Sequence, residues 1–267
     1  MHRTGFAFLD DGGRVLAFAH RGGARHPELT GLENTRTAFA HAVALGYRYL
    51  ETDVHLTEDG VLVAFHDTVL DRVTDGEGRI EDLAWSDLSS IRIAGREPVP
   101  TLPGLVEAFP AARFNIDLKA ASAVAPLAAY VTEHGLQDRV LVGSFSRRRL
   151  RRFRRLVPRA ATSASPLEVA AYVLLPARVA RLLTRRVTAL QIPHRAGGLT
   201  IASPRLVRRA HANGVRVHVW TIDDPDEMRL LLDRGVDGLM TDRTDILRDV
   251  LRERGLWSAA PPGAERS

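Results

Sequence analysis

Short apolar runs with strand character alternate with helical segments along most of this chain, and this alternation restricts the fold more than any other sequence feature. Strand–helix–strand units form parallel sheets, so the alternation predicts an α/β fold. The expected strands are residues 15–19, 48–54, 113–118, 140–144, 189–192, 215–221 and 238–241, with a weaker candidate at 160–163. Asn34 or Thr35 can cap a helix that is expected to run to Leu45.

One apolar run, residues 61–65, does not fit the alternation. It follows the second strand after only four residues, whereas a parallel crossover needs about a dozen, so it is expected to fold back as a hairpin. The remaining eight strands are the number in a TIM (β/α)8 barrel, a fold that typically needs about 250 residues. The sequence therefore predicts a TIM barrel with a small inserted segment, about 61–97, after the second strand.

No linker divides the chain, so residues 1–257 are expected to form one domain. The tail, 258–267, is polar and rich in proline and alanine, and it is expected to be disordered. The absence of cysteine excludes disulfides, thiolate–zinc sites and a cysteine nucleophile. The longest uncharged apolar run, 169–177, is far shorter than the roughly 20 residues that span a bilayer, and the first residues contain no signal-like apolar core. We therefore expect a cytoplasmic protein.

Polar side chains gather where the expected strands end, which is where barrels of this kind place their active sites. Alternate residues of a strand share a face, so Glu51 pairs with Asp53 and Asp117 pairs with Lys119, the only lysine of the chain. The remaining candidates at these ends are His20, Arg21, His66 and Trp220. Each has an ordinary alternative, such as an ion pair between Arg21 and Asp53 or a core position for Trp220. Their convergence on one rim favours a functional site.

The residue types of this rim suit phosphoryl chemistry. Three carboxylates around one point repel one another unless a cation lies between them, and hard oxygen ligands suit Mg²⁺ or Ca²⁺. Arg21 and Lys119 can stabilise a phosphoryl group, and the two histidines can serve as general acid and general base. No nucleophile elbow, P-loop, zinc-protease motif or dinucleotide-binding fingerprint is present.

At these residues the sequence resembles the glycerophosphodiester phosphodiesterase family, from residue 19 to residue 242. The motifs that carry the resemblance include AHRGG (19–23), ENT (33–35), ETDVHLTEDGVLVAFHD (51–67), NIDLK (115–119), VWTIDDP (219–225) and GVDGLMTD (235–242). The resemblance implies a TIM barrel with a small insertion after the second strand. It also implies metal-dependent hydrolysis of glycerophosphodiesters to an alcohol and glycerol 3-phosphate, with Mg²⁺ or Ca²⁺ as cofactor.

The resemblance also implies a role for each matching residue. His20 and His66 match the general acid and base. The implied metal ligands are Glu51, Asp53 and Asp117, and where Asp117 stands the family usually has glutamate. Arg21 and Lys119 match phosphate contacts, Glu33 and Asn34 match an element that borders the site, and Trp220 matches an aromatic residue at the substrate entrance. Two alternatives stay open, a lysophospholipase D of the same family and a basic binding protein on a barrel scaffold. The intact set of histidines and carboxylates argues against the binding protein.

Charge is distributed unevenly along the chain. Residues 1–146 carry a net charge of −7 and residues 147–267 one of +12, and within 147–209 sixteen arginines face a single acid, Glu168. Leu150, Phe153 and Leu156 form a narrow apolar stripe, so we expect an outer barrel helix with a solvated basic back. An alternative is that residues 147–186 contact an anionic membrane. Nucleic acid is not an expected partner, since aromatic residues are not interleaved with the arginines.

Overall fold

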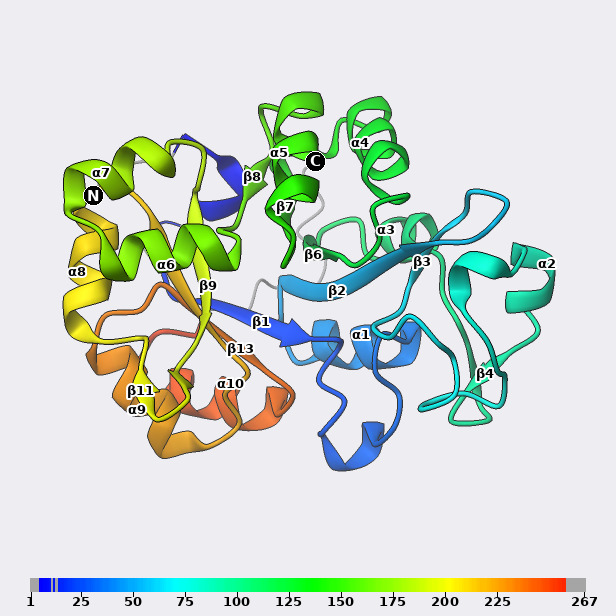
Figure 1. Cartoon of the computed structure of the whole chain (residues 1–267). Coiled ribbons are helices and arrows are strands. Elements are labelled where there is room, and N and C mark those ends of the chain that lie inside the picture. Colours follow the sequence, from blue (N-terminus) through cyan, green and yellow to red (C-terminus); the bar gives the residue numbers. More distant parts are fainter. Residues whose placement is uncertain (1–4, 11, 13, 258–267) are drawn as a thin grey trace, which may run out of the picture.

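The computed structural model describes residues 5–10, 12 and 14–257, and its core is a barrel of parallel strands (Figure 1). The strands are β1 (Leu16–His20), β2 (Tyr49–Leu56), β6 (Arg113–Leu118), β7 (Val140–Gly143), β8 (Ala161–Thr162), β9 (Ala189–Pro193), β12 (Arg216–Trp220) and β13 (Gly238–Thr241). They lie in the order β8-β7-β6-β2-β1-β13-β12-β9. A single parallel bridge between Ser163 and Ala189 joins the two ends of the sheet. The predicted TIM barrel is therefore confirmed, although it is only narrowly closed.

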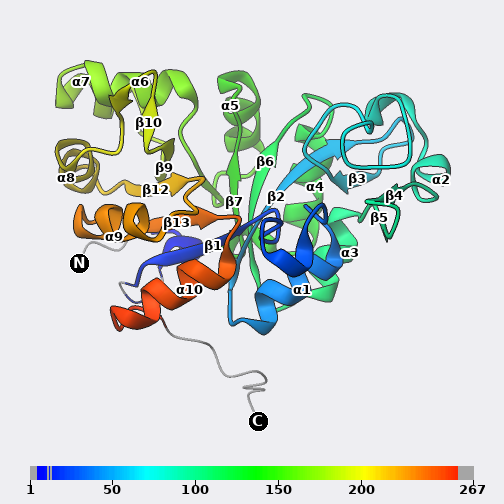
Figure 2. The ribbon, with the colours of Figure 1, turned by 90° about the horizontal axis from the view of Figure 1, so that it is seen from below.

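Helices surround the barrel (Figure 2). They are α1 (Arg36–Ala44), α2 (Trp85–Leu88), α3 (Leu102–Ala108), α4 (Val124–Glu133), α5 (Arg147–Leu156), α6 (Pro166–Leu174), α7 (Ala177–Leu183), α8 (Pro204–Ala212), α9 (Pro225–Asp233) and α10 (Thr244–Glu253). Of the two predicted caps for the first helix, Thr35 is the residue used, and its side chain accepts a hydrogen bond from the Ala38 amide at 3.2 Å. Asn34 does not cap the helix and has a different role, which is described below. Among the described residues, no helix has the length and hydropathy that a membrane span requires.

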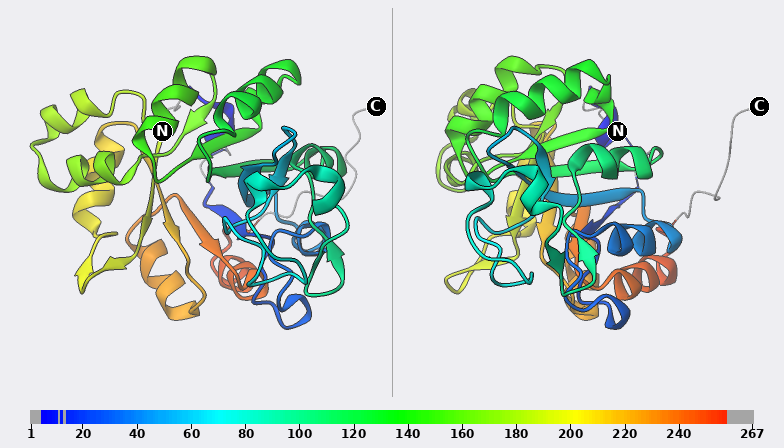
Figure 3. Two further views of the ribbon diagram at one scale, coloured as in Figure 1. Left: turned by 45° about the vertical axis from the view of Figure 1, so that its right-hand side comes forward. Right: turned by 90° about the vertical axis from the view of Figure 1, so that its right-hand side faces the viewer.

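The run that does not fit the alternation forms β3 (Leu62–Ala64) and pairs antiparallel with β2, as its short connection requires. This pairing lengthens β2 to Leu56, two residues beyond the predicted end. The chain then passes through α2, β4 (Arg92–Ile93) and β5 (Glu97–Pro98), on the opposite side of the barrel from α6–α8 (Figures 1 and 3). This segment has its own apolar cluster, made by Val63, Phe65, Leu70, Ile80, Leu88, Ile93 and Val99. Because it packs independently, it holds the residues after β3 firmly against the rim of the barrel.

The amino-terminal end of the barrel is filled with apolar side chains. Phe8 of the turn η1 (Ala7–Leu9) packs against Phe18 and Tyr49, with ring centroids 6.5 and 5.3 Å away. Higher in the barrel, Gln191 donates a hydrogen bond to Asn115 at 3.1 Å. The main cavity therefore lies at the opposite end, where the strands have their carboxyl ends.

The expectation of a solvated basic back on α5 is wrong at one position. Of the predicted apolar stripe, Leu150 and Phe153 are buried but Leu156 is 49% exposed, and Arg154 is buried, with 5% of its surface exposed. Its guanidinium contacts Glu168 of α6 at 2.6 Å, the oxygen of Thr162 at 2.8 Å and the Ser163 carbonyl at 2.7 Å. Glu168 is only 4% exposed. Glu168, the single acid of the arginine-rich region, therefore forms a buried contact that holds α6 against α5 and β8.

Glu168→Ala should destabilise the protein by about 3–5 kcal/mol, because removing one partner leaves the other charge buried and unpaired. Urea unfolding would measure the loss. The double variant Arg154→Met/Glu168→Leu is the matched control, and it should lose less than Glu168→Ala because neither charge remains. A loss below about 1 kcal/mol for Glu168→Ala would show that Arg154 finds water or another partner.

His218, inside the barrel, should make stability depend on pH. It is fully buried, and burial lowers the pKa of its imidazole from 6.5 to about 4. The unfolded chain takes up the proton near pH 6.5, so stability should fall as the pH drops from 6.5 toward 4, by up to roughly 3 kcal/mol. Urea unfolding at several pH values would show a shallower slope for His218→Gln than for the wild type. Equal slopes for the two proteins would contradict this assignment.

Candidate active site

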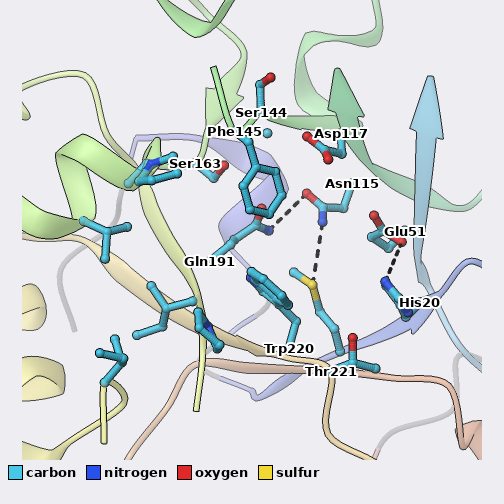
Figure 4. Close-up of a pocket in the computed structure, with 18 of the residues that line it drawn as sticks. His20, Glu51, Asn115, Asp117, Ser144, Phe145, Ser163, Gln191, Trp220 and Thr221 are labelled. Carbon is cyan, nitrogen blue, oxygen red and sulfur yellow. Dashed lines mark hydrogen bonds and ion pairs between the residues drawn. The ribbon is translucent and has the colours of Figure 1, made fainter. Parts of the chain in front are cut away.

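A cavity of about 580 Å³ opens at the carboxyl ends of the strands, and its two halves differ in chemistry. One half is polar and comes from β1, β2, β6 and the segment after β3. The other half is apolar and comes from α6, the end of β9 and the residues that follow β7 and β12. In Figure 4, His20, Glu51 and Asp117 lie on one side, and the rings of Phe145 and Trp220 project between the two halves.

Lys119 joins two of the predicted metal ligands. Its ammonium nitrogen lies 3.0 Å from Asp53 and 2.8 Å from Asp117. Burial lowers the pKa of Lys119, but the two carboxylates outweigh this effect and raise it above its usual value. The only lysine of the chain is therefore a charged member of the site.

Asp53 is 2% exposed and is positioned by three groups. Besides Lys119, the Nε of Arg21 lies 3.2 Å away, and Asn34 donates to the same carboxylate oxygen at 3.0 Å. The Thr52 hydroxyl donates to the Asn34 carbonyl at 2.8 Å and fixes the amide orientation. Burial alone would raise the pKa of Asp53, but Lys119 and Arg21 hold it below its usual value. Asp53 is therefore an anion at neutral pH.

The turn after β1 delivers Arg21 and Asn34 at a cost in backbone strain. Arg21 has a φ of 49° and Asn34 a φ of 59°, in the left-handed region that most residues avoid. Gly22, between them, has a φ of 87°, and a Cβ there would lie 2.6 Å from the Ala38 Cβ. Because Gly22 has no side chain, the turn can approach α1 closely, and a larger residue directly after Arg21 would prevent this approach.

Of the three predicted metal ligands, Glu51 is the one whose negative charge is least compensated by nearby positive groups. It is 6% exposed, accepts a hydrogen bond from the Arg21 amide at 3.2 Å, and lies 3.8 Å from the Nε2 of His20. Among the described residues, no lysine or arginine side chain lies within ion-pair distance of it. Burial and the charge of Asp53 raise the pKa of Glu51 to about 7. A cation beside Glu51 and Asp53 would relieve this cost, so the all-oxygen donor set fits a hard divalent ion.

Both predicted histidines line the cavity, and each is held by an aspartate. The Nδ1 of His20 lies 2.8 Å from Asp242, and the Nδ1 of His66 lies 2.5 Å from Asp67. Burial lowers the pKa of His20, but Glu51 and Asp242 outweigh this effect and raise it. Because Nδ1 is occupied in both rings, Nε2 is the nitrogen left to act in the cavity.

Glu33 does not line the cavity but braces its rim. It contacts Arg21 at 3.3 Å and Arg72 at 2.6 Å, and Arg72 in turn contacts Asp67 at 2.5 Å. This chain of ion pairs ties the residues after β1 to the inserted segment and so fixes His66 relative to Arg21. Asn34 likewise acts through Asp53 rather than from the cavity wall.

The sequence prediction missed three residues of this network, namely Asp242, Asp67 and Arg72. Asp242 follows β13 directly, so the rule that pointed to the other strand ends also applied to it. Asp67 stands directly after His66, but the sequence alone predicts no role for it. Arg72 lies in an irregular segment, and no local pattern indicates that it reaches Glu33.

The apolar half of the cavity was not predicted either. Val169, Ala170, Val173 and Leu174 of α6 line it, and Trp220 and Phe145 pack edge to face with their ring centroids 5.9 Å apart. Trp220 therefore lines the cavity, and its role at the substrate entrance stays a prediction. The pattern of apolar and polar residues in α6 does not distinguish a helix that lines a cavity from an ordinary outer helix of a barrel.

A separate cluster, His26, Glu28 and His41, brings its ligand atoms within 4.8 Å of one another. In the part of the chain that the structure describes, it is the only group of three or more histidines and acids that meets this spacing. It does not line the cavity. Glu51, Asp53 and Asp117 are more widely spread, with Lys119 between the two aspartates.

Comparisons with known proteins agree with this geometry. Residues 20–246 match the Glycerophosphoryl diester phosphodiesterase family. The chain is 42% identical over 260 residues to the probable glycerophosphodiester phosphodiesterase 2 of Mycobacterium tuberculosis, covering 95% of this chain and 96% of that protein. It is 27% identical to the mouse lysophospholipase D GDPD1, covering 87% and 85%.

The fold agrees with a solved relative. An Oleispira antarctica phosphodiesterase, determined in complex with its product sn-glycerol-3-phosphate, superposes with a TM-score of 0.75 at 24% identity, covering 90% of this chain and 97% of that one. The family match spans most of the described chain and includes every residue of the polar half of the cavity. This protein therefore belongs to the glycerophosphoryl diester phosphodiesterase family of hydrolases.

Proposed function

We propose that this protein hydrolyses glycerophosphodiesters to an alcohol and glycerol 3-phosphate, with a divalent cation and two catalytic histidines. The observation that carries the proposal is the meeting of two histidine–aspartate pairs, two cations and a buried carboxylate pair in one cavity. The histidine–aspartate pairs support proton transfer, and the two cations, Arg21 and Lys119, support binding of a phosphodiester anion.

Glu51 and Asp53, with Asp117, are the residues that would hold Mg²⁺ or Ca²⁺. A bound cation would neutralise charge on the phosphate and polarise the nucleophilic water. The poor compensation of Glu51 supports this assignment, because a buried carboxylate without a cationic partner is costly. Arg21 and Lys119 supply the remaining positive charge and orient the phosphate.

His20 and His66 divide the two proton transfers. One Nε2 accepts a proton from the attacking water as the new P–O bond forms, and the other donates a proton to the alcohol oxygen as its P–O bond breaks. Asp242 and Asp67 hold Nδ1 of each ring, which fixes the tautomer and the ring orientation.

The proposal is tested by incubating the protein with glycerophosphocholine, glycerophosphoethanolamine and glycerophosphoglycerol, and measuring glycerol 3-phosphate with a coupled dehydrogenase assay. The double variant His20→Ala/His66→Ala provides the background. Release that is no faster than this background for all three diesters would refute the proposal.

A second candidate is lysophospholipase D activity, on a diester that keeps one acyl chain, and the apolar half of the cavity favours it. Each buried methylene contributes about 0.8 kcal/mol, so a chain lying along α6 would gain substantially. The similarity to the mouse lysophospholipase D supports the same candidate.

Val173→Asp should therefore lower kcat/KM for lysophosphatidylcholine by at least roughly tenfold, because a charge replaces apolar contact with the chain. Its effect on glycerophosphocholine, which has no acyl chain, should stay within about threefold. Val173→Leu is the matched control and should keep both activities. Absence of lysophosphatidylcholine hydrolysis by the wild type would remove this candidate and leave the first one standing.

A further inference from the structure

The helix α7 exposes nearly all of its described side chains. Only Ala180 is buried, whereas Arg178, Val179, Arg181, Leu182 and Leu183 are exposed. An outer barrel helix normally buries an apolar stripe, as α5 does with Leu150 and Phe153. Leu182 is instead 56% exposed. The apolar content of α7 is therefore not explained by packing against the part of the chain that the structure describes.

The exposed charged residues in the sequence segment around α7 all have the same sign. Glu168, the only acid between residues 147 and 209, is buried against Arg154. Arg178, Arg181 and Arg185 are exposed, and the structure gives them no ion pair with any described residue. This face can therefore attract anions without competition from carboxylates of its own segment.

The same face continues into the mouth of the active-site cavity. Leu174, at the end of α6, lines the cavity and is 76% exposed, and α7 begins three residues later. Phe145, which also lines the cavity, is 64% exposed. Figures 1 and 2 show α6 and α7 side by side on one flank of the barrel, away from the inserted segment.

We propose that α6 and α7 form a docking face for an anionic phospholipid surface. The face consists of Leu174, Arg178, Val179, Arg181, Leu182, Leu183 and Arg185. Arginines would contact lipid phosphates while leucines enter the boundary between headgroups and acyl chains. A nucleic acid or an acidic protein would use the charges but would leave the exposed leucines without an apolar partner. Docking would turn the mouth of the cavity toward the lipid.

Sedimentation with vesicles tests this proposal directly. The wild type should sediment with phosphatidylglycerol-containing vesicles at low salt, and much less with pure phosphatidylcholine vesicles or at high salt, because screening weakens headgroup attraction. Arg178→Glu/Arg181→Glu/Arg185→Glu should weaken binding by roughly 100-fold or more. Leu182→Ser/Leu183→Ser should weaken it by about tenfold or more at unchanged charge.

A charge-matched control separates docking from general attraction. Arg151→Glu/Arg152→Glu/Arg155→Glu makes the same charge change on exposed positions of α5, and it should weaken binding much less. An equal loss from both triple variants, or no effect of the leucine substitutions, would overturn the docking face. So would failure of the wild type to sediment with anionic vesicles at low salt. Binding does not depend on the proposed function, and hydrolysis of glycerophosphocholine should be unchanged in all these variants.

Discussion

His20→Ala and His66→Ala should each lower kcat for glycerophosphocholine by about 10²–10⁴-fold, the usual contribution of a general acid or base. Each ring lines the cavity and is oriented by its own aspartate, so neither histidine can replace the other. Both lie at the rim, where their side chains are partly exposed, and urea unfolding should show little change in stability. Steady-state kinetics with the coupled assay would measure the loss.

Two further variants sharpen this test. Asp242→Asn should lower kcat less than His20→Ala and should shift the pH dependence of kcat, because it alters how the His20 ring is held rather than removing it. His134→Ala, at an exposed histidine outside the cavity, should have no effect. If His20→Ala or His66→Ala keeps more than a tenth of the wild-type kcat, that histidine does not transfer a proton in the reaction.

Removal of divalent cations should be equally damaging. EDTA should reduce activity to background, and added Mg²⁺ or Ca²⁺ should restore it. Glu51→Gln and Asp53→Asn should each lower kcat by about 10²-fold or more and raise the cation concentration needed for half-maximal activity. The physical reason is that the two buried carboxylates repel each other without a cation; burial, together with this repulsion, also raises the pKa of Glu51.

His26→Ala/His41→Ala is the control for the cation experiment. These residues form the tighter cluster outside the cavity, and the account assigns them no part in catalysis. The double variant should keep the wild-type cation dependence. Full activity of the wild type in EDTA, or loss of cation dependence in the control variant, would contradict the assignment of the metal to Glu51, Asp53 and Asp117.

The sequence predicted the barrel and most of the polar half of the site because both depend on local patterns. Apolar runs predict where the strands end, and the strand ends together form the rim. His20, Glu51, Asp53 and Asp117 could therefore be placed together from the sequence alone. The four-residue connection before residue 61 likewise required a hairpin, which the pairing of β3 with β2 confirms.

What the sequence did not predict depends on contacts between distant segments. The burial of Arg154 requires Glu168, fourteen residues later, and a run of arginines gives no sign of which one turns inward. The Glu33–Arg72 and His20–Asp242 contacts join residues that are far apart in the chain. The apolar wall of α6 has the composition of any amphipathic helix, and only the course of the chain shows that it faces a cavity.

Hydrolysis of glycerophosphocholine in ¹⁸O-labelled water, followed by ³¹P NMR and mass spectrometry, tests the central claim most directly. We expect glycerol 3-phosphate and unlabelled choline to accumulate only when a divalent cation is present, with the label on the phosphate of glycerol 3-phosphate. Labelled phosphocholine together with glycerol, or the same products in the absence of any divalent cation, would contradict it.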